Sequence, residues 1–477
     1  MRSRSPWFPR ARGNQPPRPP REVIKPLTTD LRRFNVTVSA DFIAVAAACP
    51  RRHDGRFVID CFTRNRCGRI LRMGEAGVTS EMQTPLRGVK VIELGSLIAG
   101  PYAAALLAQF GADVVKIEQP GTGDPLRSWR KLHNGTSYWW YSLNRNKKSV
   151  TLNLKSARAQ QIVRQLVKGA DIVIENFRPG WLESLALGWE DLSKVNPSLI
   201  MVRISGYGQT GPYRSRPGFA AIAESMGGLR YLSGFPDRPP VRVGVSLGDS
   251  LASLYGVIGA LLALQHRQAN PGKGQFIDLA LYEAVFGVME SLIPEFSALG
   301  HVRERSGASL PGISPSNTYP CKDRRYVIIA GNSDGIFVRL MRAIGRADLA
   351  EDARLARNEG RVEHAAMLDE VITAWTSQND SDEVLARLEA ADVPCGKIYT
   401  AADIHADPHY RAREMIQRFT LPDGTPVDLP GIVPKLSETP GETRWLGPAL
   451  GQHTEEVLAS IGIDASEMAE LRKQGVV

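Results

Sequence analysis

Residues 88–120 read GVKVIELGSLIAGPYAAALLAQFGADVVKIEQP, and this stretch decides the fold class. Its β-branched runs at 88–94 and 113–120 predict two buried strands, because a parallel strand covered on both faces is apolar throughout. Between them, the Ala- and Leu-rich run 102–112 closes with glycine and predicts a helix. The two strands and the helix form a βαβ unit, whose crossover we expect to be right-handed.

The same alternation continues along the chain. Residues 157–169 (ARAQQIVRQLVKG) predict a helix, and 170–177 (ADIVIENF) and 198–208 (SLIMVRISGYG) predict strands. Strands that alternate with helices indicate an α/β protein with a parallel sheet. We therefore expect a Rossmann-like layer of strands and helices.

Two glycines in the first turn invite interpretation as a phosphate loop. Gly95 and Gly100 have the spacing of a P-loop, but Pro101 and Tyr102 stand where Lys and Ser or Thr should be. The first turn carries no GxGxxG motif either, so Glu118 at the end of the second strand is interpreted as a surface carboxylate rather than a ribose ligand. The sequence therefore argues against an NAD-dependent oxidoreductase and against an ATPase.

The net charge of +9 belongs to one segment. Residues 1–81 hold 16 of the 59 Lys and Arg residues and 7 of the 50 Asp and Glu residues, so this segment carries the whole excess. Residues 82–477 are neutral overall. A neutral body gives no reason to expect nucleic-acid binding.

The cysteine content and the lengths of the apolar runs indicate where in the cell the protein is expected. Cys49, Cys61 and Cys67 lie in the N-terminal segment, and only Cys321 and Cys395 follow. Such scattered cysteines, with histidines outside ligand spacing, predict neither a disulfide framework nor a metal site, so a reducing, cytoplasmic location is expected. No apolar run is expected to reach the ~18–20 residues of a membrane helix, and no membrane partner is expected.

Residues 1–81 differ from the rest of the chain. Their Arg- and Pro-rich start cannot bury enough apolar surface to fold, so a disordered extension is expected. A transit peptide fits poorly because of the acidic residues and prolines, and a secretory or lipoprotein signal ending at Cys49 would lie far from the N-terminus. The preferred interpretation is a start assigned too far upstream, with translation beginning at Met73 or Met82.

Cationic side chains gather in loops at predicted strand ends. The loop 121–129 carries Arg127, and the stretch SLNRNKKSVTLNLK places Arg145, Lys147 and Lys148 before a strand. A run of charges usually marks a solvated face, but α/β proteins bind ligands at the carboxyl ends of their strands. We favour binding of a ligand that carries several phosphates.

One carboxylate stands alone in VGVSLGDSLASL (243–254). Asp249 follows Gly248 and precedes the apolar run 251–264, which predicts a helix. Such an Asp can cap a helix, because its side chain accepts hydrogen bonds from the first backbone amides. It can equally be a reacting group, and the pattern alone does not separate the two interpretations.

A series of motifs recurs in a fixed order along the chain: PLRGVKVIEL, LIAGPYAA, LAQFGADVVKIEQPGTGD, NRNKKSVTLNLK, ADIVIENFRPG, SGYGQTGP, VRVGVSLGDS, VPCGKIYTAADIHADPH and LGQHTEEVL. Together they resemble the class III CoA-transferases, which include formyl-CoA:oxalate and carnitine CoA-transferases. The resemblance covers roughly residues 85–477, and residues 1–81 resemble no part of the family.

This resemblance implies a homodimer of two interlocked chains. Each chain would have a Rossmann-like large domain, formed by residues 82–305 and by a C-terminal return over 412–477, and a smaller α/β domain over 306–411. The strand expected at 326–330 (YVIIA) would belong to the smaller domain. Linkers on both sides of that domain would cross the partner chain.

The resemblance also implies the site. The family's nucleophile, the Asp of a GD motif, corresponds to Asp249, and Gly248 would let a ligand approach backbone amides that bind an oxyanion. The family's mobile glycine-rich lid corresponds to 306–317, which holds only Gly307 and Gly312. The residues implied or expected to bind CoA are Asn176, Leu154, Lys155, Trp129, Arg127 and Lys147.

The implied reaction moves CoA from a thioester to a free carboxylate through a covalent aspartyl intermediate, with a CoA thioester as substrate and no tightly bound cofactor. A carboxylate nucleophile suits this reaction because an acyl–aspartate anhydride keeps the activation of the thioester. The stretch 218–250 most resembles the succinyl-CoA:dicarboxylate branch, whose acceptors include malate, citramalate, itaconate, mesaconate and glutarate. Arg242 or Arg230 would hold the acceptor's second carboxylate, unless these arginines form surface or dimer salt bridges.

Departures from the family narrow the alternatives. Ile98, Pro217 and Gln119 replace a Gln, a Lys and an Arg of a well-studied member, which argues against oxalate as the acceptor. The related α-methylacyl-CoA racemases use a His where this chain has Phe219, and racemisation needs an acid and a base on opposite faces of the α-carbon. A racemase of the same fold and a non-catalytic CoA-binding protein are the alternatives.

Overall fold

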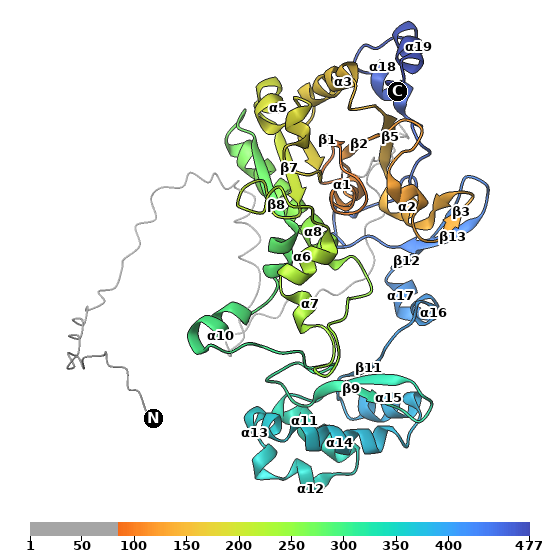
Figure 1. Cartoon of the computed structure of the whole chain (residues 1–477). Coiled ribbons are helices and arrows are strands. Elements are labelled where there is room, and N and C mark those ends of the chain that lie inside the picture. Colours follow the sequence, from red (N-terminus) through yellow and green to blue (C-terminus); the bar gives the residue numbers. More distant parts are fainter. Residues whose placement is uncertain (1–83) are drawn as a thin grey trace, which may run out of the picture. The chain divides into compact units, whose positions relative to one another are not determined.

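The computed structural model describes residues 84–477, and Figure 1 shows how their helices and strands are arranged. The predictions for residues 1–81, and the proposed starts at Met73 and Met82, lie outside the described residues.

Six parallel strands form the central sheet, in the order β5-β2-β1-β6-β7-β8. With a short separate hairpin set aside, this is the 3-2-1-4-5-6 order of a doubly wound fold. The predicted α/β class and Rossmann-like sheet are therefore confirmed. The strands are β1 (Lys90–Glu93), β2 (Asp113–Glu118), β5 (Lys147–Thr151), β6 (Ile172–Glu175), β7 (Ile200–Ser205) and β8 (Gln275–Ala280).

Helices cover both faces of this sheet because neighbouring residues of a strand point to opposite faces, and both faces carry apolar side chains that need burial. Val91, for example, lies in the core on one face and Ile92 in the core on the other. The first face is covered by α1 (Ala99–Gln109), α6 (Ala220–Met226), α8 (Leu247–Ala269) and α9 (Leu281–Phe286), and the second by α3 (Ala157–Lys168), α5 (Trp189–Val195), α18 (Thr454–Ala459) and α19 (Ala465–Lys473).

A second sheet has three antiparallel strands in the order β11-β10-β9, and it has a core of its own. Its central strand β10 (Tyr326–Ala330) coincides with the predicted strand YVIIA. This core lies within the predicted smaller domain 306–411, whose bounds stay a prediction. The other elements of this part are β9 (Ser316–Pro320), α11 (Asp334–Ala343), α12 (Ala347–Ala350), α13 (Asn358–Glu363), α14 (Ala365–Thr376), α15 (Ser381–Ala390) and β11 (Cys395–Lys397).

Shorter elements complete the described chain. They are β3 (Leu132–His133), β4 (Thr136–Ser137), α2 (Tyr138–Leu143), α4 (Trp181–Ser184), α7 (Leu229–Leu232), α10 (Leu292–Leu299), α16 (Ala401–Ala406), α17 (Pro408–Ala412), β12 (Ile416–Thr420) and β13 (Pro426–Pro430), with 3-10 turns at Pro125–Ser128 and Ala353–Leu355.

Helix α8 corrects one expectation. With 23 residues and a mean hydropathy of 1.6, it is long and apolar enough to cross a membrane, which no run of the sequence was expected to be. The helix nevertheless packs on β7 and β8, and its buried residues are small ones such as Gly256 and Ala260. Its other side leaves Leu254, Ile258 and Leu262 exposed. The outer face of this core helix is therefore apolar.

Candidate active site

The order of the strands reverses between β1 and β6, and the loops that follow these two strands are joined by hydrogen bonds. The Ser96 amide donates to Asn176 Oδ1 over 2.8 Å, and Asn176 Nδ2 donates to the Ser96 carbonyl over 2.9 Å. Doubly wound proteins bind ligands in the crevice at such a reversal point. The Asn176–Ser96 bridge therefore marks the place where a ligand site is expected.

The two glycines of the first turn have a packing role. A Cβ atom at Gly95 would lie 2.6 Å from Asn176 Oδ1, and one at Gly100 would lie 3.1 Å from it. Both positions need glycine because the Asn176 amide occupies the space of a side chain. The two glycines therefore make room for the Asn176 side chain, and this explains their spacing without a phosphate-binding role.

A buried ion network supports the loop after β1. Lys116 Nζ lies 2.7 Å from Glu93 Oε1 and 2.8 Å from Asp124 Oδ2, and it donates to the Gly95 carbonyl. Asp124 also accepts a hydrogen bond from the Leu97 amide. Although burial opposes the charged form, the carboxylates raise the pKa of Lys116, so the cation persists and fixes the loop.

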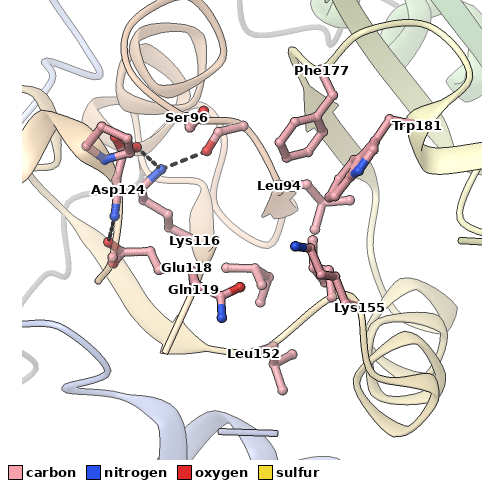
Figure 2. Close-up of a pocket in the computed structure, with 15 residues that line it drawn as sticks. Leu94, Ser96, Lys116, Glu118, Gln119, Asp124, Leu152, Lys155, Phe177 and Trp181 are labelled. Atoms are coloured by element: carbon pink, nitrogen blue, oxygen red, sulfur yellow. Dashed lines mark hydrogen bonds and ion pairs between the residues drawn. The ribbon is translucent and has the colours of Figure 1, made fainter. Parts of the chain in front are cut away.

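A cavity of about 210 Å³ lies on one side of the bridge, at the ends of β1, β2 and β5. Figure 2 shows Phe177, Trp181 and Lys155 facing the Lys116 network across it. Leu154 is buried in the same wall. Lys116 is paired with carboxylates of the same wall, so apolar side chains and the Lys155 ammonium group remain, which suit a flat ring system that carries a phosphate. The structure thus places two predicted CoA contacts, Leu154 and Lys155, in one cavity.

A second cavity of about 420 Å³ lies on the other side of the bridge and contains Asp249. The two cavities share Ser96 and Phe177 in their linings. Among the described residues that line the second cavity, the charged groups are Asp249, Arg178, Arg216 and Arg242. Three guanidinium groups beside one carboxylate make this cavity attractive to anionic ligands.

Trp129 and Phe219 form part of the second cavity's wall, and both rings are exposed, with 40% and 72% of their surface accessible. Asn176 lines the same cavity and uses both amide atoms in the bridge. The predicted positions of Trp129 and Asn176 near the reacting groups therefore agree with this geometry, and their contacts with CoA stay a prediction.

Asp249 lies in the first turn of α8, three residues after Ser246, which occupies the N-cap position. It is therefore not the helix cap. Burial and the Glu224 carboxylate raise the pKa of Asp249 to about 6, while Arg242 acts in the opposite direction. A helix N-terminus favours the ionised form of a carboxylate, but at Asp249 burial and a like charge outweigh this effect. Near pH 7 the group is still mainly a carboxylate.

Three kinds of comparison agree with this geometry. The sequence profile of CoA-transferase family III matches residues 86–454. The chain belongs to this family of enzymes. As a family III CoA-transferase, it is 48% identical over 395 residues to succinyl-CoA–D-citramalate CoA-transferase of Chloroflexus aurantiacus, covering 82% of this chain and 98% of that relative.

Other relatives have similar names. The transferase is 44% identical to the succinyl-CoA–L-malate CoA-transferase beta subunit of Chloroflexus aurantiacus, over 82% of this chain and 98% of the relative. It is 35% identical to succinate–glutarate CoA-transferase of Agrobacterium fabrum, over 79% and 96%. The crystal structure of a CAIB/BAIF family protein from Brucella suis superposes with a TM-score of 0.71 at 37% identity, over 79% of this chain and 99% of that protein.

Two of the transferase's predicted CoA-binding residues have partners inside the protein. Lys147 begins β5 and is fully buried; its ammonium group pairs with Glu93 and donates to the Pro101 carbonyl. Burial, helped by the Lys116 cation, lowers the pKa of Lys147 to about 8. The burial and the partners of this ammonium group argue against the prediction that Lys147 binds CoA.

Arg127 is also occupied. Its guanidinium donates two hydrogen bonds to Glu118 and one to the Pro448 carbonyl, and it lies 3.6 Å from the centre of the Trp140 ring. These partners give Arg127 a structural role, and its contact with CoA stays a prediction. The interpretation of Glu118 as a surface carboxylate is wrong, because the residue is buried and pairs with Arg127.

The residue that the sequence did not reveal is Glu224, on α6. Its carboxylate is buried, and Oε1 accepts a hydrogen bond from the Gly248 amide at 3.4 Å. A Cβ atom at Gly248 would touch Ala220 and Glu224 of α6 at 3.4 Å. These are ordinary van der Waals distances, and the Gly248 amide already has Glu224 as a partner, so the oxyanion-binding role of Gly248 stays a prediction.

The two arginines predicted to bind the acceptor's carboxylate differ in their position relative to the Asp249 cavity. Both contact Glu224 Oε2, Arg230 at 3.2 Å and Arg242 at 3.3 Å. Arg242 lines the Asp249 cavity, whereas Arg230 does not belong to the lining residues that the structure describes. Arg242 is thus the better placed of the two predicted residues.

Proposed function

We propose that this enzyme transfers CoA from succinyl-CoA to a dicarboxylic acid, with Asp249 as the nucleophile. The observation that carries the proposal is the single carboxylate of the second cavity, set among three arginines. The names of the relatives support the substrate class, since they include succinyl-CoA with citramalate, malate and glutarate. Cytoplasmic location belongs to the same proposal.

In the proposed mechanism, an Asp249 oxygen attacks the thioester carbonyl. The C–S bond breaks, CoA leaves as a thiolate, and a succinyl–aspartyl anhydride forms. The thiolate then attacks the aspartyl carbonyl, which releases succinate and leaves an aspartyl-CoA thioester. The acceptor carboxylate attacks this thioester and expels CoA thiolate, which leaves an anhydride between the acceptor and Asp249. The thiolate then attacks the acceptor's carbonyl carbon in this anhydride. This step releases the new acyl-CoA and regenerates the Asp249 carboxylate. No step consumes water, so the activation of the thioester is conserved.

The two cavities give a reason for the placement of CoA. A ligand with its ring system near Phe177 and Trp181 would reach the second cavity across the Asn176–Ser96 bridge, where both linings meet. The Asp249 side chain is partly buried in this cavity, and a bound CoA thioester would displace water that could hydrolyse the anhydride.

A racemase mechanism has less support. Racemisation needs a second acid or base facing the α-carbon. Among the described residues of the second cavity, the ionisable groups besides Asp249 are arginines, which stay protonated. Phe219, which stands in place of the racemase histidine, cannot transfer a proton.

A labelled-acid exchange experiment tests the function. The purified protein is mixed with succinyl-CoA and a panel of ¹³C-labelled mono- and dicarboxylic acids, and labelled acyl-CoA is measured by mass spectrometry. A transferase incorporates the label, preferentially from dicarboxylates. A CoA-binding protein incorporates none, and a racemase takes up deuterium at the α-carbon without exchanging the acid; either result contradicts the proposal.

Arg242→Gln should weaken selection for dicarboxylates. The Arg242 guanidinium lines the Asp249 cavity and can bind the carboxylate that does not react. Loss of this charge-assisted pair should lower kcat/KM for glutarate relative to pentanoate by about 10–100-fold, which corresponds to roughly 1.4–3 kcal/mol. Arg230→Gln is the matched control, because Arg230 also pairs with Glu224 but is not among the described residues that line the Asp249 cavity. Equal loss of preference in both variants would exclude a direct role for Arg242.

We also propose a homodimer that covers the apolar outer face of α8. Leu254, Ile258 and Leu262 recur at helical spacing along this face, and Leu262 is 66% exposed. Apolar side chains gathered on one face mark a protein–protein interface. The protein should elute at twice its 52.3 kDa chain mass in light-scattering chromatography. Ile258→Asp with Leu262→Asp should yield monomers, whereas Leu132→Asp, on a separate hairpin, should leave the dimer intact.

A monomeric native protein would contradict this proposal. Two relatives are named as subunits of the malate enzyme, so a mixed assembly is another outcome that counts against the homodimer. Pure recombinant chain distinguishes the cases, because a chain that needs a different partner stays monomeric alone.

A further inference from the structure

Four charged groups meet at the start of α8, and two of them, Glu224 and Arg230, have no part in the reaction proposed above. Asp249 is the nucleophile in the proposed function, and Arg242 faces it from the preceding loop. Glu224 of α6 lies behind them with only 1% of its surface exposed, and Arg230 of α7 completes the cluster. A carboxylate that is buried this deeply costs free energy unless partners compensate it.

The Glu224 carboxylate divides its two oxygens between two tasks. Oε1 accepts the Gly248 amide, the residue directly before Asp249, and so contacts the first turn of α8. Oε2 lies 3.3 Å from Arg242 Nε and 3.2 Å from Arg230 Nη2. Glu224 therefore contacts the helix turn that carries Asp249. It also contacts Arg242, the cation that acts on the Asp249 charge.

No side chain among residues 84–477 donates a hydrogen bond to the Asp249 carboxylate. An arginine free to move would pair with this carboxylate and make it a weaker nucleophile, because a paired oxygen has lost basicity. Glu224 holds the Arg242 Nε atom instead. The nucleophile thus stays unpaired although a cation is near.

We propose that Glu224 is a positioning residue for CoA transfer: it keeps Arg242 from pairing with Asp249, and its fixed negative charge maintains Asp249 as a basic, reactive carboxylate. The inference rests on the proposed role of Asp249. It extends that role by assigning a function to a side chain that touches no substrate.

The charges around Asp249 support this assignment. Glu224 raises the pKa of Asp249 and Arg242 lowers it, with burial as the larger cause of the rise. The other charged groups of the cavity are Arg178, which donates to the Ser215 carbonyl, and Arg216, which lies over the Tyr213 ring. Both are engaged with other residues, so Glu224 and Arg242 are the groups that oppose each other at the nucleophile.

The charge balance also changes during the reaction. Two carboxylates face two guanidinium groups in the free enzyme, so the cluster of Glu224, Asp249, Arg230 and Arg242 is neutral. Once Asp249 has formed the CoA thioester, its charge disappears and the cluster carries +1. The acceptor's carboxylate is therefore attracted at the stage where it is needed.

The test compares pH profiles of kcat/KM for succinyl-CoA in the wild type, Glu224→Gln and Glu224→Asp. This parameter reports ionisation of the free enzyme, and activity should fall as pH drops through about 6 because protonated Asp249 is no nucleophile. In Glu224→Gln the acid limb should move to lower pH by at least about 0.5 unit, since a like charge is lost. Glu224→Asp should keep the wild-type limb.

Glu224→Gln should also lower the plateau rate at high pH, by about 10-fold or more, because a less basic carboxylate attacks more slowly. Glu304→Gln is the control, since Glu304 is an exposed carboxylate bonded to Tyr231 and does not line the cavity. An unchanged limb and plateau in Glu224→Gln would overturn the proposal, whereas activity in Asp249→Asn would overturn the proposed function itself.

A folding defect in Glu224→Gln would not remove the test. Arg242 is half-exposed, so Arg242→Gln should fold, and it leaves Glu224 as the charge that acts on Asp249. Its acid limb should move to higher pH. An unmoved limb in Arg242→Gln would overturn the opposition between Glu224 and Arg242 and the proposal with it.

Discussion

Asp249→Ala is expected to abolish CoA transfer, with kcat lowered by at least about 10³-fold, as for the loss of other covalent nucleophiles. Asp249 is the one carboxylate among the described residues that line the second cavity, and no arginine there can replace it. The variant should fold, because removal of a partly buried, unpaired carboxylate relieves repulsion from Glu224. Its melting temperature should therefore not fall.

The measurement is labelled-acid exchange with succinyl-CoA as donor, beside thermal unfolding and circular dichroism. Asp249→Asn keeps the shape of the side chain and should be equally inactive. Ser250→Ala is the matched control in the same helical turn, because the Ser250 hydroxyl bonds only back to the Ser246 carbonyl. Hydroxylamine added to wild type with succinyl-CoA should give a hydroxamate at Asp249, detected by peptide mass spectrometry. Undiminished exchange by Asp249→Ala would end the covalent mechanism.

Strands β1, β2, β6 and β7 could be predicted from the sequence, because their β-branched residues come in short runs bounded by glycines and polar residues. Strand β8 was not predicted, and β5 begins at Lys147, which was expected to precede the strand. The bounds of α8 were less accessible. The helix begins at Leu247, four residues before the expected run, because Gly248 and Asp249 read as a turn until the packing of α6 is known.

The chemistry of the site was only partly visible. Asp249 stood out as an isolated carboxylate, but the groups that control it come from elsewhere in the chain. Glu224 lies in the ordinary helical stretch AAIAES, and its role arises because α6 and α8 pack closely at Gly248. A single sequence contains no sign of this contact.

Charged residues misled the sequence interpretation for a related reason. Lys147 and Arg127 were expected at a ligand because they stand near predicted strand ends. Inside the fold, Lys147 meets Glu93 and Arg127 meets Glu118, residues of the apolar-looking strands β1 and β2. Once buried, such cations pair with carboxylates inside the protein and stabilise the fold. Tertiary packing decides which residues are buried, and spacing along the chain does not reveal it.

Asn176→Leu is expected to weaken binding of the CoA thioester, with KM raised about 10–100-fold as the substrate loses its preformed site. The substitution keeps the size of the side chain but leaves the Ser96 amide and carbonyl without their partners at 2.8 and 2.9 Å. The loop 94–98 lines both cavities, so its displacement alters the cavity that holds Lys155 and the cavity that holds Asp249 together. Stability should fall by about 2–4 kcal/mol for two unpaired backbone groups.

Asn196→Leu separates the local effect from general destabilisation. Asn196 Nδ2 also donates to two backbone carbonyls, of Val167 and Ala170, at 3.0 and 2.7 Å, and Asn196 lines neither cavity. The two variants should lose comparable stability in urea unfolding, but only Asn176→Leu should raise KM. Comparable KM changes would mean that binding follows overall stability. That result would contradict the idea that the Asn176–Ser96 bridge joins the two cavities into one binding site.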